Sequence, residues 1–255
     1  MNIKYALKSL GAAVLYLAIY LGTQFAVSAT ALSSGLDINR YIVHLSAASA
    51  VLAIMIFVLL FALRRKKVTH EIELKKIPPI SCILIPIFGA AVNVVMACIL
   101  ALIPFPKEWM NEYNAVISEI AAPNNLISVL FTVLLAPLSE EITMRGLIHT
   151  RIRRILPTFA AMIISSSVFG MIHGIKIQII YAALLGLLIA WIFEKSGSLL
   201  ASILFHIGFN ACGLILPLYS GNLPLLFVIC AALSLGITAY IQQTSKRKIE
   251  FVKKY

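Results

Sequence analysis

Residues 125–150 read NLISVLFTVLLAPLSEEITMRGLIHT, an apolar run interrupted by two adjacent glutamates and one arginine. A helix of about 20 residues can cross a bilayer, so this run is long enough to do so. Ionisable side chains in hydrocarbon cost roughly 2.5–3.5 kcal/mol each on a lenient scale, and they usually mark a functional site. Glu140, Glu141 and Arg145 therefore predict a membrane helix that carries such a site.

The remainder of the chain has the same apolar character. Hydrophobic residues make up 61% of the 255, and charged residues 12%, about half the share of a soluble domain. We expect an all-α membrane protein with spans near 8–32, 43–63, 79–104, 125–150, 158–175, 177–194, 198–218 and 222–243. We divide it into N-terminal helices and an external loop (1–124), a core (125–218), and a last helix with a basic tail (219–255).

The net charge of +11 comes from basic residues at the ends of apolar runs. Such a distribution indicates membrane topology, so we predict no nucleic-acid partner. With a cytoplasmic N-terminus, the connections at 64–78, 151–157, 194–197 and 244–255 lie inside the cell and carry most of the basic residues. The connections on the opposite side contain only three lysines or arginines: Arg40, Lys107 and Lys176. The sequence predicts a multi-pass protein of the cell membrane, with both termini cytoplasmic and basic residues near anionic lipid headgroups.

Several other segments have simpler interpretations. The first run resembles a signal peptide, but it is longer than the usual core of 7–15 residues, which favours an uncleaved anchor. Segment 105–124 is either an amphipathic helix at the membrane surface or a plain loop. The four cysteines lie in apolar runs without paired spacing, which indicates buried apolar residues and no disulfides: Cys82, Cys98, Cys212 and Cys230.

Polar residues within the predicted spans concentrate in the fourth, fifth and seventh. His173 and His206 lie in the latter two. A helical rise of about 1.5 Å per residue places Glu140 roughly 16 Å and His206 roughly 12 Å from the cytoplasmic edge. We expect one site between these three helices, in the cytoplasmic half.

Helical spacing predicts which of these side chains face each other. His206 and Asn210 are four residues apart, so they share a face. Arg145 can reach back one turn to pair with Glu141, whereas Glu140 is rotated by about 100° toward another neighbour.

Three short motifs resemble those of a known family. Glu140-Glu141-Ile-Thr-Met-Arg145 matches EExxxR, Phe169-Gly-Met-Ile-His173 matches FxxxH, and His206-Ile-Gly-Phe-Asn210 matches HxxxN. Together they resemble the CPBP family of CAAX prenyl proteases and bacteriocin-processing enzymes, also called the Abi family, over roughly residues 125–215. The resemblance implies an eight-helix membrane bundle that hydrolyses peptide bonds, with the motif residues at its active site.

Peptide hydrolysis needs an activated water, a base and donors for the oxyanion. We expect Glu140 to act as the base, His173 to orient the water, and His206 and Asn210 to stabilise the oxyanion. Glu140, His173 and His206 would also suit zinc, although no HExxH motif is present. Metal-free and metal-dependent hydrolysis are both open. Some of these residues also have purely structural interpretations. Glu141 and Arg145 could form an ion pair, Phe169 could be a packing residue, and Asn210 could link two helices.

Two other classes of function are compatible with the sequence. Intramembrane Glu, His and Arg residues also occur in proton-coupled transporters, although we find no repeated halves. A catalytically silent member could serve as a bacteriocin-immunity protein or signalling scaffold. For a protease, the predicted substrate is a membrane-embedded or lipid-anchored peptide or protein.

Overall fold

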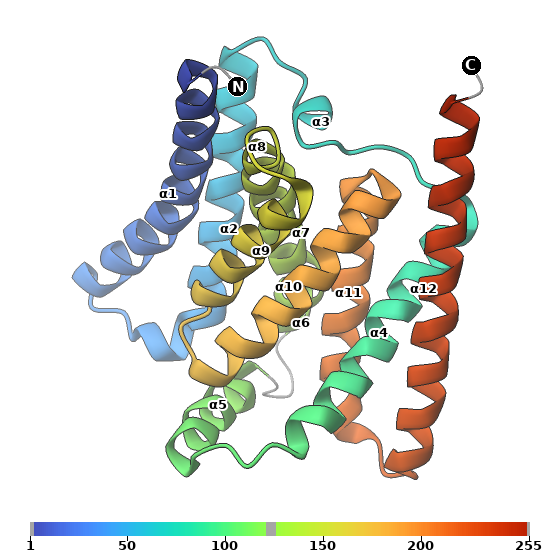
Figure 1. Cartoon of the computed structure of the whole chain (residues 1–255). Helices are drawn as coiled ribbons and strands as arrows, with labels where there is room; N and C mark the ends of the chain where they lie inside the picture. The colour runs from blue at the N-terminus through green and yellow to red at the C-terminus, as the bar shows by residue number, and fades with distance from the viewer. Residues whose placement is uncertain (1–2, 121–125, 254–255) are drawn as a thin grey trace.

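The computed structural model describes residues 3–120 and 126–253, which form a bundle of helices (Figure 1). No strand occurs among these residues, so the predicted all-α class is confirmed. The end of the predicted external connection, 121–124, and the last two residues of the predicted tail lie outside the described residues. Helices are the expected response to apolar runs, because a backbone in hydrocarbon must satisfy its own hydrogen bonds.

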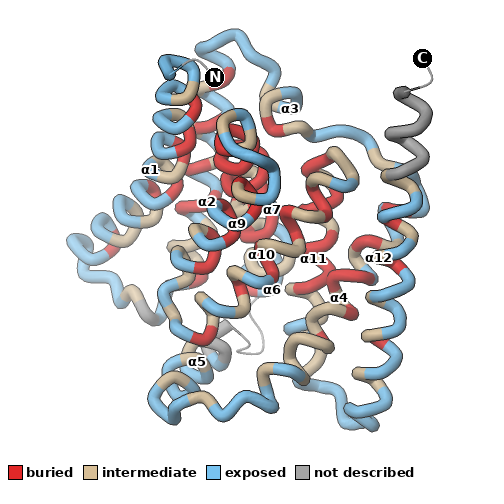
Figure 2. The backbone as a smooth tube through the Cα atoms, in the orientation of Figure 1, coloured by how far each residue is buried: buried red, intermediate tan, exposed pale blue. Residues whose placement is uncertain are grey.

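Seven helices in the described residues are long and apolar enough to cross a membrane. They are α1 (Ile3–Ser33), α2 (Ile38–Leu63), α4 (Pro79–Ala101), the composite helix Leu126–Ile152, α10 (Lys176–Ser196), α11 (Leu199–Ile215) and α12 (Leu223–Lys253). Between 17% and 44% of the residues in their apolar windows are buried inside the bundle. Buried positions gather on the facing sides of the central helices, and the outer helices are largely exposed (Figure 2). Exposed apolar surface on this scale fits a multi-pass membrane protein.

The predicted fifth span, 158–175, is shorter than expected. Helix α9 (Thr158–Met171) has 14 residues, about 21 Å of helix against roughly 30 Å of hydrocarbon. A turn joins it to α10, and Gly174 in that turn has a φ of +77°, a conformation that glycine adopts without steric cost. The prediction of about eight spans is thus close, with seven full-length helices and this shorter one.

The start of α1, the loop at 64–78 and the end of α12 lie at one end of the bundle (Figure 1). We call this the basic end, because it also carries Arg151 and Arg153, at the end of the fourth span and just after it, and Lys195 near the end of α10. Both ends of the described chain therefore lie on the same side. Which side faces the cytoplasm stays a prediction, as does the interpretation of the first span as an uncleaved anchor.

The opposite end carries α5 (Lys107–Ile120), and we call it the α5 end (Figure 1). The helical interpretation of segment 105–124 is therefore confirmed for the described part. Tyr113 packs edge-on against Tyr181 of α10, and the Lys176 ammonium lies 5.6 Å from the Trp109 ring centre. Burial raises the pKa of the Tyr113 hydroxyl. These contacts hold α5 beside the start of α10.

Ion pairs tie the elements of the basic end together. Arg151 of α8 (Thr150–Ile152) bonds Glu71 of α3 (Val68–Glu71) at 2.7 Å, and Arg153 bonds both Glu73 and Glu194. Burial alone would raise the pKa of the Glu71 carboxyl, but the hydrogen bond from Lys66 and the charge of Arg151 lower it overall. Arg151 and Arg153 therefore stabilise the packing of this end, in addition to indicating the topology of the chain.

The composite helix 126–152 is wound unevenly. It runs through α6 (Leu126–Leu130), a π-helical segment η1 (Phe131–Leu135), α7 (Ala136–Glu141), a second π-helical segment η2 (Ile142–His149) and α8. π-helical turns are rare and often occur at functional sites, because the wider turn re-aims side chains. Here they flank the turn that carries Glu140 and Glu141.

Helices α4 and α11 cross at unusually close range. A Cβ atom added at Gly208 of α11 would lie 2.0 Å from the carbonyl oxygen of Pro86, and one at Gly89 of α4 would lie 2.0 Å from that of Phe205. Small residues allow such approach between membrane helices. The crossing positions α11, whose His206 and Asn210 flank Gly208. After α11 the chain passes through the short helix η3 (Leu216–Leu218) to α12.

We expect Gly208→Ala to destabilise the protein, because the added methyl group would have to push the α4 backbone away. Gly236→Ala is the matched control, since nothing lies within 4 Å of a Cβ at that position of α12. Thermal unfolding in detergent should show a midpoint lowered by several degrees for Gly208→Ala, about 1–3 kcal/mol, and an unchanged or higher midpoint for the control. Equal midpoints would contradict the close crossing.

Candidate active site

The best-defined part of the site is a fully buried ion pair. Arg145 and Glu141 both have no exposed side-chain surface, and Arg145 Nη1 donates to Glu141 Oε1 at 3.2 Å. The predicted pair at a spacing of four residues is therefore confirmed. Arg145 Nη2 also donates to the carbonyl oxygen of Gly186 in α10, at 2.8 Å. One guanidinium thus joins the fourth span to α10.

The Phe169 ring links this pair to the histidines. The Arg145 guanidinium lies over the ring, 4.6 Å from its centre, an arrangement that favours a cation. The ring of His173 packs edge-on at 4.9 Å and that of His206 at 5.9 Å. Phe169 is therefore a packing residue that holds three polar groups in place.

His206 lies between the two carboxylates. Its Nδ1 atom is 2.9 Å from Glu141 Oε1, and its Nε2 atom is 3.7 Å from Glu140 Oε2. Since Glu141 is paired with Arg145 as a carboxylate, Nδ1 carries the hydrogen and donates it. In the neutral form of the imidazole, the Nε2 atom on the side of Glu140 is then unprotonated.

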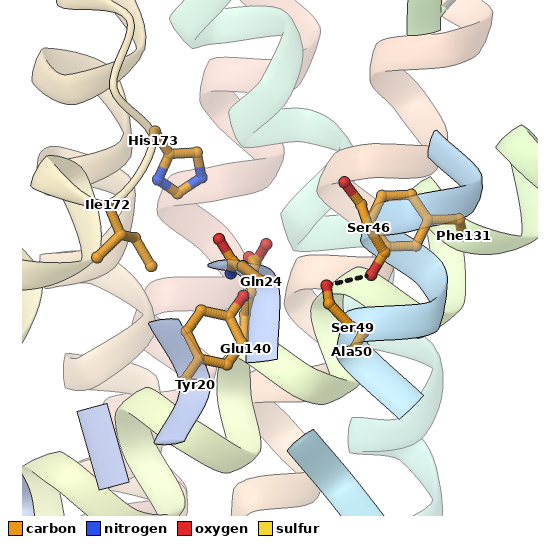
Figure 3. Close-up of a pocket in the computed structure, with 9 residues that line it drawn as sticks. All are labelled: Tyr20, Gln24, Ser46, Ser49, Ala50, Phe131, Glu140, Ile172 and His173. Carbon is orange, nitrogen blue, oxygen red and sulfur yellow. Dashed lines mark hydrogen bonds between the residues drawn. The ribbon is translucent and has the colours of Figure 1, made fainter. Parts of the chain in front are cut away.

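Glu140 faces a cavity of about 130 Å³, as expected from its rotation away from Glu141. Its side chain is 16% exposed, whereas that of Glu141 is fully buried. Figure 3 shows Glu140 and His173 among the residues that line this cavity. The two adjacent carboxylates thus have different surroundings, one in the cavity wall and one in an ion pair.

His173 lies in a different place from the one predicted. It follows α9 in the turn to α10, not in the interior of a span. Its Nδ1 donates to the Phe169 carbonyl oxygen at 2.7 Å, because a carbonyl can only accept. Neutral His173 therefore also has an unprotonated Nε2.

Asn210 makes a contact that spacing alone could not predict. Its Nδ2 atom donates to the carbonyl oxygen of Thr132 at 2.8 Å. Thr132 belongs to the π-helical segment η1. The observed contact links α11 to the fourth span, which is the structural interpretation of Asn210, and one Nδ2 hydrogen is left for another partner.

Sequence reasoning missed the residues that α1 and α2 bring to the cavity. Tyr20 and Gln24 of α1 and Ser46 and Ser49 of α2 line it with Glu140 (Figure 3). These helices carry no motif, and isolated serines or tyrosines in apolar runs are common. The only signal was the spacing of Tyr20 and Gln24, and of Ser46 and Ala50, four residues apart on one helical face.

The cavity lies closer to the α5 end than predicted. Gln24 lies in the second half of α1, Ser46 in the first half of α2, Phe131 near the start of the fourth span and His173 after α9. The prediction of a site in the half nearer the basic end is therefore wrong for the cavity. That prediction used only the depth of each residue along its own helix. The position of the cavity depends instead on where neighbouring helices pack less closely.

The predicted zinc set has a partial geometric basis. Glu140 and His206 approach each other, but no group of three His, Cys, Asp or Glu side chains in the described residues could hold a metal ion. Metal dependence therefore stays a prediction.

Comparison with known proteins supports the resemblance drawn from the motifs. Residues 122–212 match a family model described as type II CAAX prenyl endopeptidase, Rce1-like, which confirms the recognition over a little more than a third of the chain. The match contains all three motifs, and it supports an endopeptidase of the CAAX type. No curated protein and no solved structure matches the chain.

The buried pair can be tested by a double-mutant cycle. Arg145→Leu would leave the Glu141 carboxylate without its cation, and we expect a loss of about 3–5 kcal/mol in the free energy of unfolding. Adding Glu141→Gln should recover part of this loss, because the uncompensated charge is removed. Unfolding in mild detergent of the two single variants, Arg145→Leu and Glu141→Gln, and of the double variant completes the cycle. Additive losses would show that the two side chains do not interact.

Proposed function

We propose that the chain, with the Rce1-like endopeptidase segment at residues 122–212, is an intramembrane endopeptidase that hydrolyses peptide bonds of membrane-associated substrates. The observation that carries the proposal is the meeting of Glu140 and His206 Nε2, at 3.7 Å, beside the polar cavity. A water molecule within hydrogen-bond reach of both atoms would have a base and an orienting acceptor.

In the proposed step, Glu140 takes a proton from this water while the water oxygen bonds to the carbonyl carbon of the scissile peptide. The protonated Glu140 then gives that proton to the amide nitrogen, and the carbon–nitrogen bond breaks. His206 orients the water, and the Glu141–Arg145 pair fixes the imidazole hydrogen on Nδ1. Glu141 and Arg145 therefore act by positioning His206.

The developing oxyanion needs hydrogen-bond donors. The neutral tautomers of His173 and His206 present acceptors at Nε2, so neither donates unless it is protonated. Side chains that can donate line the cavity, namely the Tyr20 hydroxyl, the Gln24 amide and the hydroxyls of Ser46 and Ser49. We assign oxyanion stabilisation to this wall of α1 and α2, with Asn210 as a further donor from α11.

The substrate class follows from the surroundings of the cavity. Membrane helices enclose the cavity, so a peptide must reach it from the bilayer or from the α5 end. A membrane-embedded or lipid-anchored peptide meets this requirement. With the basic end cytoplasmic, the α5 end is external, so an external approach is open to the substrate.

We expect Glu140→Gln to abolish peptide hydrolysis, lowering kcat/KM by at least about 10³-fold, because the amide cannot take the proton. Glu112→Gln is the matched control, since it makes the same change at an exposed carboxylate of α5 that does not line the cavity. Purified protein in vesicles, assayed on membrane-anchored peptides with C-terminal CAAX sequences, measures both variants. Retained activity in Glu140→Gln, or an equal loss in Glu112→Gln, would refute the assignment.

The same assay separates the remaining interpretations. Dialysis against a strong chelator, followed by zinc, tests metal dependence, because a metal-free enzyme keeps its rate throughout. A cellular phenotype that survives Glu140→Gln would favour a silent scaffold or immunity protein over a protease.

The orientation of the bundle has a direct test. In a background without Cys82, Cys98, Cys212 and Cys230, we expect Glu112→Cys in α5 to react with a membrane-impermeant maleimide on intact cells. Arg64→Cys, in the loop at the basic end, should react only after permeabilisation, because the positive-inside rule places it in the cytoplasm. The reverse labelling pattern would invert the proposed topology.

A further inference from the structure

A second cavity, of about 200 Å³, lies at the basic end and is separate from the Glu140 cavity. Helices α4, α10 and α12 form its walls, and the spans they contribute begin at Pro79 and end at Ser196 and Ser245. The residues that line it include Pro78, Ser196 and Ser245. All three spans therefore reach the membrane surface at the level of this cavity.

The lining combines apolar and polar side chains. Ile85, Ile192 and Ile241 contribute buried apolar surface, and the polar lining includes the hydroxyls of Ser81 and Thr244. An amphipathic cavity of this kind suits a ligand with both a hydrocarbon part and a polar head.

The charge of the lining indicates the sign of the polar head. Lys76 and Lys195 line the cavity, and no acidic residue does. Neither lysine pairs with a carboxylate of the described residues, whereas Lys66 and Lys75, nearby in the chain, pair with Glu71 and Glu73. Two unneutralised ammonium groups at the edge of an apolar cavity favour an anion.

We propose that this cavity binds an anionic phospholipid, with its phosphate between Lys76 and Lys195 and its acyl chain along the isoleucines. A soluble phosphate ester could satisfy the lysines, but it would leave the isoleucine wall without an apolar partner. A zwitterionic lipid would satisfy that wall without the charge. The location at the ends of three spans places the lysines at headgroup level, where basic residues attract anionic lipids.

The site has a structural connection to α11. The cavity residues Ile85, Ile192 and Ile241 belong to one apolar cluster with Phe205 and Phe209 of α11. Phe205 directly precedes His206 in the chain, and Phe209 directly precedes Asn210. A lipid in the cavity would therefore pack against the cluster that positions α11. The proposal does not depend on peptidase activity, because lipid binding can be measured without a substrate.

Trp191 provides a reporter, because it packs against the same cluster and precedes Ile192 in α10. In Trp109→Phe protein, Trp191 is the remaining tryptophan. Reconstituted into phosphatidylcholine vesicles, it should be quenched more by brominated phosphatidylglycerol than by brominated phosphatidylcholine. We expect a preference of about 5-fold or more, which Lys76→Gln with Lys195→Gln reduces to about 1.

The matched control removes two positive charges from the same end of the bundle, outside the cavity. Arg64→Gln with Lys67→Gln should keep the preference. Wild-type quenching without a lipid preference, an unchanged preference in the Lys76/Lys195 variant, or equal losses in both variants would overturn the proposal. Displacement of brominated phosphatidylglycerol by millimolar glycerol phosphate would also overturn it, in favour of a soluble ligand. Unchanged size-exclusion profiles confirm that each variant is folded.

Discussion

A fully buried guanidinium in a membrane bundle needs a counter-charge and hydrogen-bond acceptors within the protein, and both Nη atoms of Arg145 find acceptors. Its Nε atom has no hydrogen-bond partner among the described residues. Glu141 supplies the charge from the preceding turn, Gly186 supplies a carbonyl from α10, and Phe169 supplies an aromatic face from α9. Losing one of these partners would leave a polar group exposed to low dielectric, at high cost. The fourth span, α9 and α10 are therefore fixed relative to one another by one side chain.

The same interaction separates the two adjacent carboxylates into different roles. Glu141 is held by Arg145 and by the Nδ1 atom of His206, so the other ring nitrogen, Nε2, lies on the side of Glu140. Glu140 lines the cavity and is accessible. The proposed division into a positioning carboxylate and a proton-accepting one follows from a rotation of about 100° between neighbouring helical residues. The π-helical segments η1 and η2 on either side of α7 orient the turn so that Glu140 and Glu141 both approach His206.

The two ends of the bundle contain different kinds of polar structure. At the basic end, two carboxylates of the 64–78 loop and one of α10 neutralise Arg151 and Arg153, which ties this loop to the fourth span and α10. Lys76 and Lys195 remain outside this network, next to an apolar cavity. The Glu140 cavity lies toward the α5 end and is lined by hydroxyl and amide groups from α1 and α2. Lipid contact and peptide chemistry would therefore occur at opposite ends.

The sequence by itself determined the helical class, nearly all the spans, the three motifs and the Glu141–Arg145 pair. These follow from local rules, since hydropathy marks a span and a spacing of four residues places side chains on one face. The tertiary structure alone decided that α1 and α2 line the cavity, that Asn210 bonds Thr132, and that His173 lies in a turn beyond α9. It also decided the end toward which the cavity lies. These features depend on how helices cross, and the crossing of α4 and α11 depends on the close backbone contact at Gly89 and Gly208, which no periodicity within a single helix encodes.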